Sequence, residues 1–362
     1  MHSETKRGAP GCAGPLPWAV RGGIMTDGMP QSAGLTIAVT GATGELGQPF
    51  VRALEQTAEV ARVRAMARRP FDPQRLGWRK TEYRQGDILD RAAVEQLVAG
   101  VDVVAHLAFI VVKASARSYE INIQGSRNVF EATAAAGIPR LVYTSSLAAY
   151  GYYPHEGLLT EDTLARGTER HAYSRQKADV ERVLREALAG SATTEAYVFR
   201  PCVVAGPDAP ALLDQIPYLQ LEHTLPNWAL GGLRAIPRLK PVLPDNGVPF
   251  QLVHHDDVAA ALVAGVLARG APGIYNLAAL GEVQWSDVAD ALGWYSVRIP
   301  KRAFDATADI AGRIPALEVQ AGWLEAMRVP MLMDCTRARR ELGWQPAYDA
   351  RQTLHELVAA YR

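Results

Sequence analysis

From residue 35 onward, short apolar runs alternate with longer segments of mixed polarity, an order typical of strands followed by helices. The continuous apolar run Val101–Leu107 has the character of a strand that is buried on both faces, whereas Asn122–Ala136 is amphipathic. The predicted strands are Leu35–Val39, Val63–Ala67, Val101–Leu107, Leu141–Tyr143, Tyr197–Arg200 and Ile274–Leu277. The predicted helices are Leu46–Gln56, Arg91–Val98, Asn122–Ala136, His171–Leu188 and Val258–Leu267.

Sequential strand–helix units predict an α/β fold with right-handed crossovers and a doubly wound parallel sheet of the Rossmann type. The alternation loosens between Pro207 and about Pro249, where further prolines interrupt it. These are Pro210, Pro217, Pro226, Pro237, Pro241 and Pro244. We therefore predict a main domain at residues 34–206, completed by about residues 251–280, and a smaller, discontinuous C-terminal lobe at 207–250 and 281–362.

Residues 1–33 are rich in glycine, proline and small polar residues and lack periodicity, so we expect a disordered N-terminal tail. Prolines at positions 10, 15 and 17 interrupt the apolar stretch that a signal peptide would need. Met25 and Met29 lie close to the first predicted strand, and either one is a candidate for a downstream translation start.

The composition is that of an ordinary globular protein, since 48% of the 362 residues are hydrophobic and 21% are charged. The 38 basic side chains balance the 38 acidic ones, so no net charge attracts nucleic acid or an anionic membrane. The longest apolar run, Val101–Val112, contains Asp102 and His106 and is well short of a membrane span. We expect neither nucleic acid nor a membrane as a partner.

The three cysteines, Cys12, Cys202 and Cys335, are far apart in the sequence and have no CxxC spacing. Neither a disulfide framework nor a cysteine zinc site is therefore indicated. A reducing, cytoplasmic location is the expectation.

The segment Gly41-Ala42-Thr43-Gly44-Glu45-Leu46-Gly47 follows an apolar strand and opens a helical segment, as a phosphate-binding glycine loop does. Glycine is needed in such a loop because a tight turn requires positive φ and because the backbone must approach a pyrophosphate without an intervening Cβ. Such spacings also occur by chance in loops. The motif therefore predicts a dinucleotide site only in combination with a second signal.

That second signal is the pair Tyr173 and Lys177, whose spacing of four places both side chains on one face of a helix. A free phenol has a pKa near 10 and is a poor acid–base group at neutral pH. A nearby ammonium, joined by the positive ring of an oxidised nicotinamide, favours the phenolate and lowers that pKa. An isolated YxxxK spacing is more often a plain surface pair, so the hypothesis depends on the two motifs together.

Ser146 belongs to a cluster of hydroxyl groups at the end of the predicted strand Leu141–Tyr143. Open parallel sheets bind ligands at the carboxyl ends of their strands, which makes Ser146 a candidate to hydrogen-bond a substrate oxygen while Tyr173 moves its proton.

With these motifs, the chain between about residues 35 and 360 resembles an extended short-chain dehydrogenase/reductase, the group that includes NAD-dependent epimerases and dehydratases. Further segments fall in that family's order: Gly86-Asp87-Ile88, Ala105-His106-Leu107-Ala108, Asn122 within Asn122–Val129, Arg200-Pro201, and His254-His255-Asp256-Asp257-Val258. The resemblance implies a catalytic set of Ser146, Tyr173 and Lys177.

The resemblance also implies which residues contact the cofactor. Asp87 and Ile88 would flank the adenine, Leu107 and Ala108 would lie under the cofactor, and Pro201 would lie near the nicotinamide. Asn122 would sit behind the active-site helix. The full implied set is Gly41, Thr43, Gly44, Glu45, Leu46, Gly47, Arg68, Arg69, Asp87, Ile88, Leu107, Ala108, Asn122, Ser145, Tyr173, Lys177 and Pro201.

The identity of the cofactor is encoded at the end of the second predicted strand. An NAD site usually has an acidic residue there for the ribose 2′-hydroxyl, whereas a 2′-phosphate favours guanidinium groups. The strand Val63–Ala67 is followed by Arg68 and Arg69 and by no acid, which favours NADP. NAD stays possible, because arginine pairs at the start of a loop are often only solvated charges.

The run His254-His255-Asp256-Asp257 consists of residue types that bind metals. Four adjacent residues cannot all face one ion from an extended strand that enters a helix, because side chains alternate along the strand. We expect Asp256 or Asp257 to cap the helix Val258–Leu267 and expect no metal.

Three reactions share the hydride transfer that the resemblance implies: net oxidation or reduction, epimerisation, and dehydration. Dehydratases of the family tend to carry an Asp-Glu pair where Leu147 and Ala148 follow Ser146. Relatives that bind nucleotide sugars usually place an asparagine shortly after the strand-end arginine, but Arg200 is followed by Pro201-Cys202-Val203-Val204. An NAD(P)-dependent oxidoreductase acting on a small-molecule carbonyl or alcohol is therefore favoured.

A nucleotide-sugar 4-epimerase is the alternative, with Arg234 or Arg238 as a diphosphate ligand, and a non-catalytic dinucleotide-binding protein is the second alternative. Apolar residues of the lobe favour a lobe core over a substrate pocket. They are Leu225, Trp228, Leu230, Leu233 and Ile236. By analogy with the family, the helices Asn122–Ala136 and His171–Leu188 could pair in a homodimer.

Overall fold

The computed structural model describes residues 34–111, 116–214, 216, 219, 240–311, 313 and 324–362, all within the unit Gly34–Arg362. The predicted disordered tail, Arg234, Arg238 and the apolar residues between 225 and 236 lie outside the described residues. Among the described residues, no helix combines the length and the apolar character that crossing a bilayer requires.

The centre of the fold is a sheet of seven parallel strands in the order β10-β6-β5-β4-β1-β2-β3. The strands are β1 (Leu35–Thr40), β2 (Val60–Ala67), β3 (Thr81–Gln85), β4 (Val103–His106), β5 (Arg140–Thr144), β6 (Glu195–Pro201) and β10 (Gly273–Leu277). The chain reverses its direction of winding between β1 and β4, which is where doubly wound sheets bind their ligands. The predicted α/β, Rossmann-type fold is confirmed.

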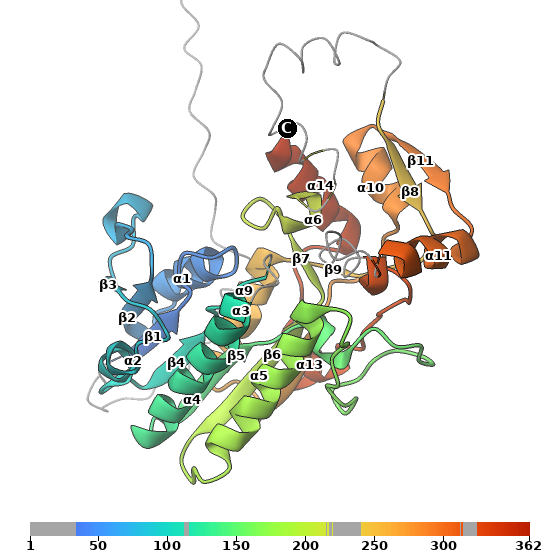
Figure 1. The fold of residues 1–362 in the computed structure, drawn as a ribbon. Helices are drawn as coiled ribbons and strands as arrows, with labels where there is room; N and C mark the ends of the chain where they lie inside the picture. Colours follow the sequence, from blue (N-terminus) through green and yellow to red (C-terminus); the bar gives the residue numbers. More distant parts are fainter. Residues whose placement is uncertain are drawn as a thin grey trace, which may run out of the picture. The chain divides into compact units, whose positions relative to one another are not determined.

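Helices cover both faces of this sheet (Figure 1). Helices α1 (Gly47–Gln56) and α9 (His255–Val266) pack on one face, and α2 (Arg91–Val98), α4 (Ser126–Ala135) and α5 (Ala172–Leu188) pack on the other. Alternate side chains of each strand supply the two cores. In β5, for example, Val142 joins the core of α1 and α9, whereas Tyr143 joins the core of α4 and α5.

A turn of π-helix, Ile121–Gly125, connects α3 (Ala116–Glu120) to α4. The amphipathic pattern predicted a helix from Asn122, but the regular α-helix begins at Ser126, four residues later. A Cβ at Gly125 would overlap the side chain of Ile88, so a larger residue at this position would require Ile88 to shift. This insertion sets which way Asn122 faces.

The sequence pattern did not predict β3, because only Thr81 of its five residues is buried and an edge strand of this kind lacks an apolar run. Two short parallel pairs were also not predicted, β7 (Val203–Ala205) with β9 (Leu252–His254) and β8 (Val242–Asp245) with β11 (Tyr295–Arg298).

The remaining elements are η1 (Pro73–Leu76), η3 (Leu147–Tyr150), α6 (Ala211–Asp214), α10 (Trp285–Leu292), α11 (Lys301–Ala311), α13 (Thr336–Glu341) and α14 (Ala350–Tyr361). A third apolar cluster joins several of these elements, with Leu213, Trp285 and Leu354 among its buried members. The division into a main domain and a discontinuous lobe stays a prediction.

Candidate active site

The glycine loop lies between β1 and α1 at the switch point of the sheet. Gly41 has φ +80°, and a Cβ on it would lie 2.6 Å from the backbone nitrogen of Ala108. A Cβ on Gly47 would overlap the carbonyl oxygen of Gly41. Only glycine fits these two positions, because the loop closes both on itself and on the segment that follows β4.

Gly44 is different, because it is exposed and a Cβ on it would lie 3.4 Å from the Gly41 carbonyl oxygen, near ordinary contact distance. No side chain caps α1 at Leu46, so that end of the helix is left open to an anionic ligand. Thr43 is half-buried and Glu45 is exposed. Partial desolvation of its carboxylate and the charge of Asp214 nevertheless raise the pKa of Glu45. The open side of the loop is therefore the side of Gly44.

Arg68 and Arg69 follow β2 and are exposed. Their backbone is held in place, since the Arg68 carbonyl accepts from Gln85 Nε2 at 3.1 Å and the Arg69 carbonyl accepts from the Tyr83 hydroxyl at 2.9 Å. Among the described residues, neither guanidinium group forms an ion pair. Two cations on a fixed backbone thus face solvent beside the switch point.

Asp87 and Ile88 follow β3. Because β1 and β3 run in the same direction, these two residues lie at the same edge of the sheet as the glycine loop after β1. Asp87 Oδ1 accepts from the backbone N–H of Leu89 at 3.0 Å, which shapes the turn. Ile88 is buried, and its carbonyl accepts from Asn128 Nδ2 of α4 at 2.9 Å.

His106 ends β4 and connects three elements beneath the site. Its Nδ1 lies 2.7 Å from Thr40 Oγ1 of β1, and its Nε2 lies 2.9 Å from Ser126 Oγ of α4. Burial, together with the charge of Lys177, lowers the pKa of His106 to about 3. The ring is neutral at physiological pH, and Leu107 and Ala108 follow it against the glycine loop.

Lys177 is buried on α5, where its Nζ donates to the Thr144 carbonyl at 2.9 Å and lies 3.8 Å from the centre of the Phe109 ring. Burial lowers the pKa of Lys177 to about 7, and the carboxylate of Glu181 opposes this effect. A Lys with so low a pKa switches between its charged and neutral forms near neutral pH.

Tyr173 is half-buried one helical turn before Lys177, with the Phe109 ring edge-on at 5.6 Å between centroids. Burial raises the pKa of its phenol, and a hydrogen bond with the side chain of Ser146 opposes the rise. Ser146 is buried and also accepts from the Ala148 N–H at 3.1 Å, which fixes its rotamer. The structure thus brings Ser146, Tyr173 and Lys177 together.

Asn122 lies behind α5, where its Nδ2 donates to Gln176 Oε1 at 2.6 Å. Its amide also brackets Ile110, accepting from that residue's N–H at 2.8 Å and donating to its carbonyl at 3.0 Å. Ile110 is next to Phe109, so Asn122 fixes the strand-end segment that packs on Lys177.

Ser145 was predicted to contact the cofactor, but it is 2% exposed and its hydroxyl donates to Glu181 Oε1 at 2.6 Å. Glu181 also binds Arg200 in a two-point pair, with Nε–Oε1 at 2.9 Å and Nη2–Oε2 at 2.6 Å. Pro201, buried beside Arg200, ends β6. The residues of this network were not singled out together from the sequence, although Glu181 follows Lys177 by one helical turn.

Lys177→Met is expected to change the free energy of unfolding, relative to that of the unchanged protein, more favourably near pH 6 than near pH 10. The folded chain releases the Lys177 proton near pH 7, whereas an unfolded lysine keeps it to about 10.5, so the unfolded state binds more protons between these values. Stability contributed by this group therefore rises with pH across that window. We expect a difference of roughly 2–4 kcal/mol between the two pH values.

Chemical denaturation at both pH values measures this effect. Lys80→Met is the control, because the half-buried Lys80 likewise donates to a backbone carbonyl, that of Thr57 at 2.7 Å. An effect of Lys177→Met that is the same at both pH values would contradict the prediction.

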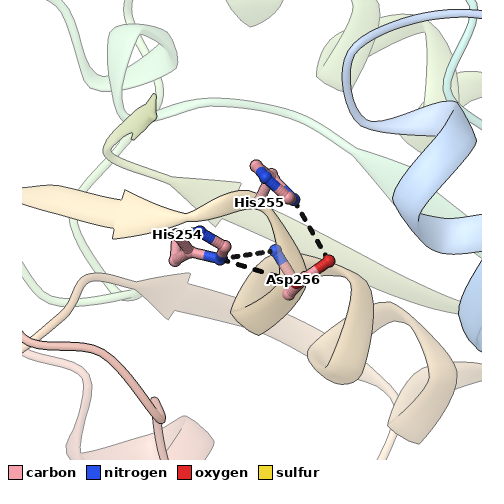
Figure 2. A group of neighbouring side chains, drawn as sticks. All are labelled: His254, His255 and Asp256. Carbon is pink, nitrogen blue, oxygen red and sulfur yellow. Dashed lines mark hydrogen bonds and ion pairs between the residues drawn. The ribbon is translucent and has the colours of Figure 1, made fainter. Parts of the chain in front are cut away.

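His254, His255 and Asp256 form a group whose ligand-type atoms lie within 4.8 Å of one another (Figure 2). His254 Nδ1 accepts the Asp256 N–H at 3.2 Å, and His255 Nδ1 lies 3.1 Å from Asp256 Oδ1. Arg52 Nη2 donates to the same oxygen at 3.2 Å. The guanidinium of Arg52 is in contact with the only carboxylate of this group, and its positive charge opposes the binding of a metal cation there. This arrangement supports a structural role for the three residues over a metal site.

The predicted cap of α9 was wrong. The helix begins at His255, and the imidazole of His254 caps it, so Asp256 and Asp257 lie inside the first turn. Asp257 instead accepts from the backbone N–H groups of Ala347 at 2.7 Å and Tyr348 at 3.2 Å, which ties α9 to the C-terminal segment.

Among the described residues, the two cysteine side chains form no hydrogen bond to the residues of this site. Cys202 and Cys335 are buried free thiols, and burial raises the pKa of both. Cys12 lies outside the described residues.

A family model described as the NAD dependent epimerase/dehydratase family matches residues 37–278. An uncharacterized protein of Sinorhizobium fredii is 28% identical over 340 residues, which are 90% of this chain and 78% of that protein. An uncharacterized protein of Mycobacterium tuberculosis is 30% identical over 331 residues, 91% of this chain, but the match spans only 30% of that longer protein. Sterol demethylase protein B of Methylococcus capsulatus is 33% identical over 205 residues, 56% of this chain and 59% of that protein.

Solved structures share the fold at low identity. The dTDP-glucose 4,6-dehydratase of Bacillus anthracis in complex with NAD has a TM-score of 0.67 at 19% identity and covers 90% of this chain and 96% of its own. A short-chain dehydrogenase/reductase superfamily protein from Agrobacterium tumefaciens with bound NAD has a TM-score of 0.66 at 22% identity. The match covers 90% of this chain and 97% of that protein. The UDP-glucose 4-epimerase of Thermotoga maritima with UDP-glucose has a TM-score of 0.65 at 19% identity. The match covers 91% of this chain and 99% of that protein.

Proposed function

Since the chain belongs to the NAD-dependent epimerase/dehydratase family, we propose that it is an NAD(P)-dependent oxidoreductase that interconverts a carbonyl and an alcohol on a small molecule. The observation that carries the proposal is the convergence of Ser146, Tyr173 and Lys177 at the strand ends beside the glycine loop.

The residues at the switch point fit a dinucleotide. Gly41 and Gly47 shape a loop that only glycine can form, and Gly44 leaves its outer side open to a pyrophosphate. The other proposed contacts are Thr43, Glu45, Leu46, Asp87, Ile88, Leu107, Ala108, Asn122, Tyr173, Lys177 and Pro201, whereas Ser145 is buried against Glu181 and is not among them. When bound, the nicotinamide would supply or accept a hydride at the substrate carbon.

The protein's own groups handle the oxygen of the substrate. Tyr173 gives its phenolic proton to that oxygen in reduction and takes it back in oxidation. Lys177, when protonated, lowers the cost of the phenolate that remains. Ser146, already a hydrogen-bond partner of the phenol, donates to the same oxygen and stabilises the charge that develops on it.

We further propose that the cofactor is NADP, because Arg68 and Arg69 face solvent beside the switch point without an ion pair to another described residue. The double substitution Arg68→Ala/Arg69→Ala is expected to weaken NADPH binding by about tenfold or more, the scale of a lost charge-assisted hydrogen bond, and to leave NADH binding nearly unchanged. Fluorescence titration of the purified protein with each nucleotide measures both affinities.

Arg339→Ala/Arg340→Ala is the matched control, because it removes an adjacent pair of exposed arginines from α13. An unchanged preference between NADPH and NADH in the Arg68/Arg69 variant would refute the role of these arginines, and a preference of the unchanged protein for NADH would refute the NADP assignment.

The oxidoreductase and the epimerase differ in how they respond to nucleotide sugars. Titration with NADPH and NADH, followed by UDP-glucose and UDP-galactose, should show preferential NADPH binding and no response to either sugar. Tight NADH binding with a nucleotide-sugar response would instead favour a nucleotide-sugar 4-epimerase. The similarity to sterol demethylase protein B supports the search for apolar alcohols and ketones as substrates.

A cytoplasmic location and a homodimer through α4 and α5 stay proposals. The exposed sides of these two helices are joined by an ion pair between Arg127 and Glu186, with Nη2 and Oε2 3.0 Å apart. A second copy would therefore meet a charged surface, and sedimentation measured at low and high salt would test whether this surface associates.

A further inference from the structure

Ser145, Glu181 and Arg200 form a buried polar network directly under the proposed catalytic groups, and we call these three residues the clamp. Their exposed fractions are 2%, 2% and 1%. The carboxylate of Glu181 accepts three hydrogen bonds, one from the Ser145 hydroxyl at 2.6 Å and two from the Arg200 guanidinium at 2.9 and 2.6 Å.

Each member of the clamp is adjacent to a residue of the proposed site. Ser145 precedes Ser146 at the end of β5, and Arg200 precedes Pro201 at the end of β6. Glu181 lies one turn after Lys177 on the same face of α5. The clamp therefore joins two strand ends to the helix that carries Tyr173 and Lys177.

We propose that Ser145 and Glu181 are positioning residues, which hold Ser146 at hydrogen-bonding distance from the phenol of Tyr173. The inference rests on the proposed function for its effect on turnover, but the geometry it describes exists without a substrate. The end of β5 is also held on its backbone side, where the Ser145 N–H donates to the Phe199 carbonyl at 2.7 Å and the Thr144 carbonyl accepts from Lys177 Nζ at 2.9 Å. The side-chain bond between Ser145 and Glu181 adds a second link to α5, one that acts directly on the residue before Ser146.

Arg200 makes this link rigid. Its two-point contact with Glu181 fixes the plane of the carboxylate, and its guanidinium carbon lies 4.4 Å from the centre of the Tyr150 ring. The Tyr150 hydroxyl in turn donates to Asn276 Oδ1 of β10 at 2.6 Å. The carboxylate that receives Ser145 is thus anchored to three strands as well as to α5.

Ser145 is the residue to change, because removing Glu181 or Arg200 would leave a buried charge without its partner and would endanger folding. Ser145→Ala removes one hydroxyl and leaves the ion pair intact. Ser145→Thr restores the hydroxyl at the same position. Thr133→Val is the matched control, because it removes a buried hydroxyl that donates to the Val129 carbonyl at 2.6 Å, near the opposite end of α4 from the site.

Two measurements are made on each variant. One is turnover with the cofactor and substrate of the wild-type protein. The other is the pKa of Tyr173 in the protein alone, from ¹³C-tyrosine NMR with the signal assigned by its loss in Tyr173→Phe. The titratable groups that face Tyr173 are Lys177 on α5, His171 at the N-cap of α5, Tyr143 on β5 and Tyr152 after η3, and none of these residues is substituted in the variants.

We expect Ser145→Ala to lower kcat by about tenfold with little change in cofactor affinity, and to raise the pKa of Tyr173 by about half a unit or more. Ser145→Thr should reverse both effects, and Thr133→Val should show neither. If Ser145→Ala shifts the pKa of Tyr173 but the wild-type protein shows no hydride transfer, the result would support the clamp and refute the proposed function. An unchanged phenol pKa and kcat in Ser145→Ala would overturn the clamp, whatever the loss of thermal stability.

Discussion

Tyr173→Phe is expected to lower turnover by roughly 10²-fold or more while leaving cofactor binding nearly intact. The substitution removes only the phenolic oxygen, and the ring keeps its edge-on contact with Phe109. Ser146 and Lys177 stay in place, because Ser146 is also bonded to the Ala148 N–H and Lys177 to the Thr144 carbonyl. The loss therefore isolates the proton transfer from the binding of the nucleotide.

Steady-state kinetics and nicotinamide fluorescence measure the two quantities separately. Tyr197→Phe is the matched control, because the Tyr197 hydroxyl donates to the Gly270 carbonyl at 3.0 Å near the amino-terminal end of β6, away from the site. Unchanged turnover in Tyr173→Phe would refute the assignment of Tyr173 as the acid–base group.

Gly47→Ala is expected to cost several kcal/mol of stability and to abolish nucleotide binding. The added Cβ would overlap the carbonyl oxygen of Gly41 and the backbone of Ala42, and neither can move without opening the turn between β1 and α1. Backbone atoms cannot change rotamer to relieve such an overlap. The start of α1 must therefore shift away from the loop.

Gly44→Ala separates the loop's shape from its function. Its Cβ would meet only the Gly41 carbonyl oxygen, at 3.4 Å, so the fold should tolerate it. The same methyl group would occupy the side on which we propose the pyrophosphate lies, and nucleotide affinity should fall by about tenfold or more. Thermal denaturation and fluorescence titration of both variants distinguish the two effects, and a Gly47→Ala protein as stable as Gly44→Ala would contradict the prediction.

Local patterns predicted the fold well, because each strand–helix unit is encoded in adjacent residues. The glycine loop and the Tyr173–Lys177 pair are of this kind, since a turn and one face of a helix are set within a few residues. The elements that were not predicted depend on distant partners. Strand β3 is paired only on one side, with β2, and its polar residues give no periodic signal.

The contacts within the site were harder to foresee for the same reason. Ser145 and Glu181 are 36 residues apart, and nothing near either one indicates that their side chains meet. Two helices also begin differently from the pattern, because the backbone N–H groups of their first turns have hydrogen-bond partners other than the expected ones. The imidazole of His254 replaced a carboxylate as the cap of α9, and a π-turn preceded α4.

The π-turn at Ile121–Gly125 also limits how the length of this segment can change. A π-turn contains more residues per turn than an α-helix, so it sets the rotational phase between the residues before and after it. With this phase, Asn122 faces Gln176 of α5 while Asn128 faces the carbonyl of Ile88. Deleting one residue would rotate one asparagine away from its partner by roughly a quarter of a turn. The number of residues in this segment is therefore constrained as well as the identity of Asn122, and homologous chains should not tolerate insertions or deletions here.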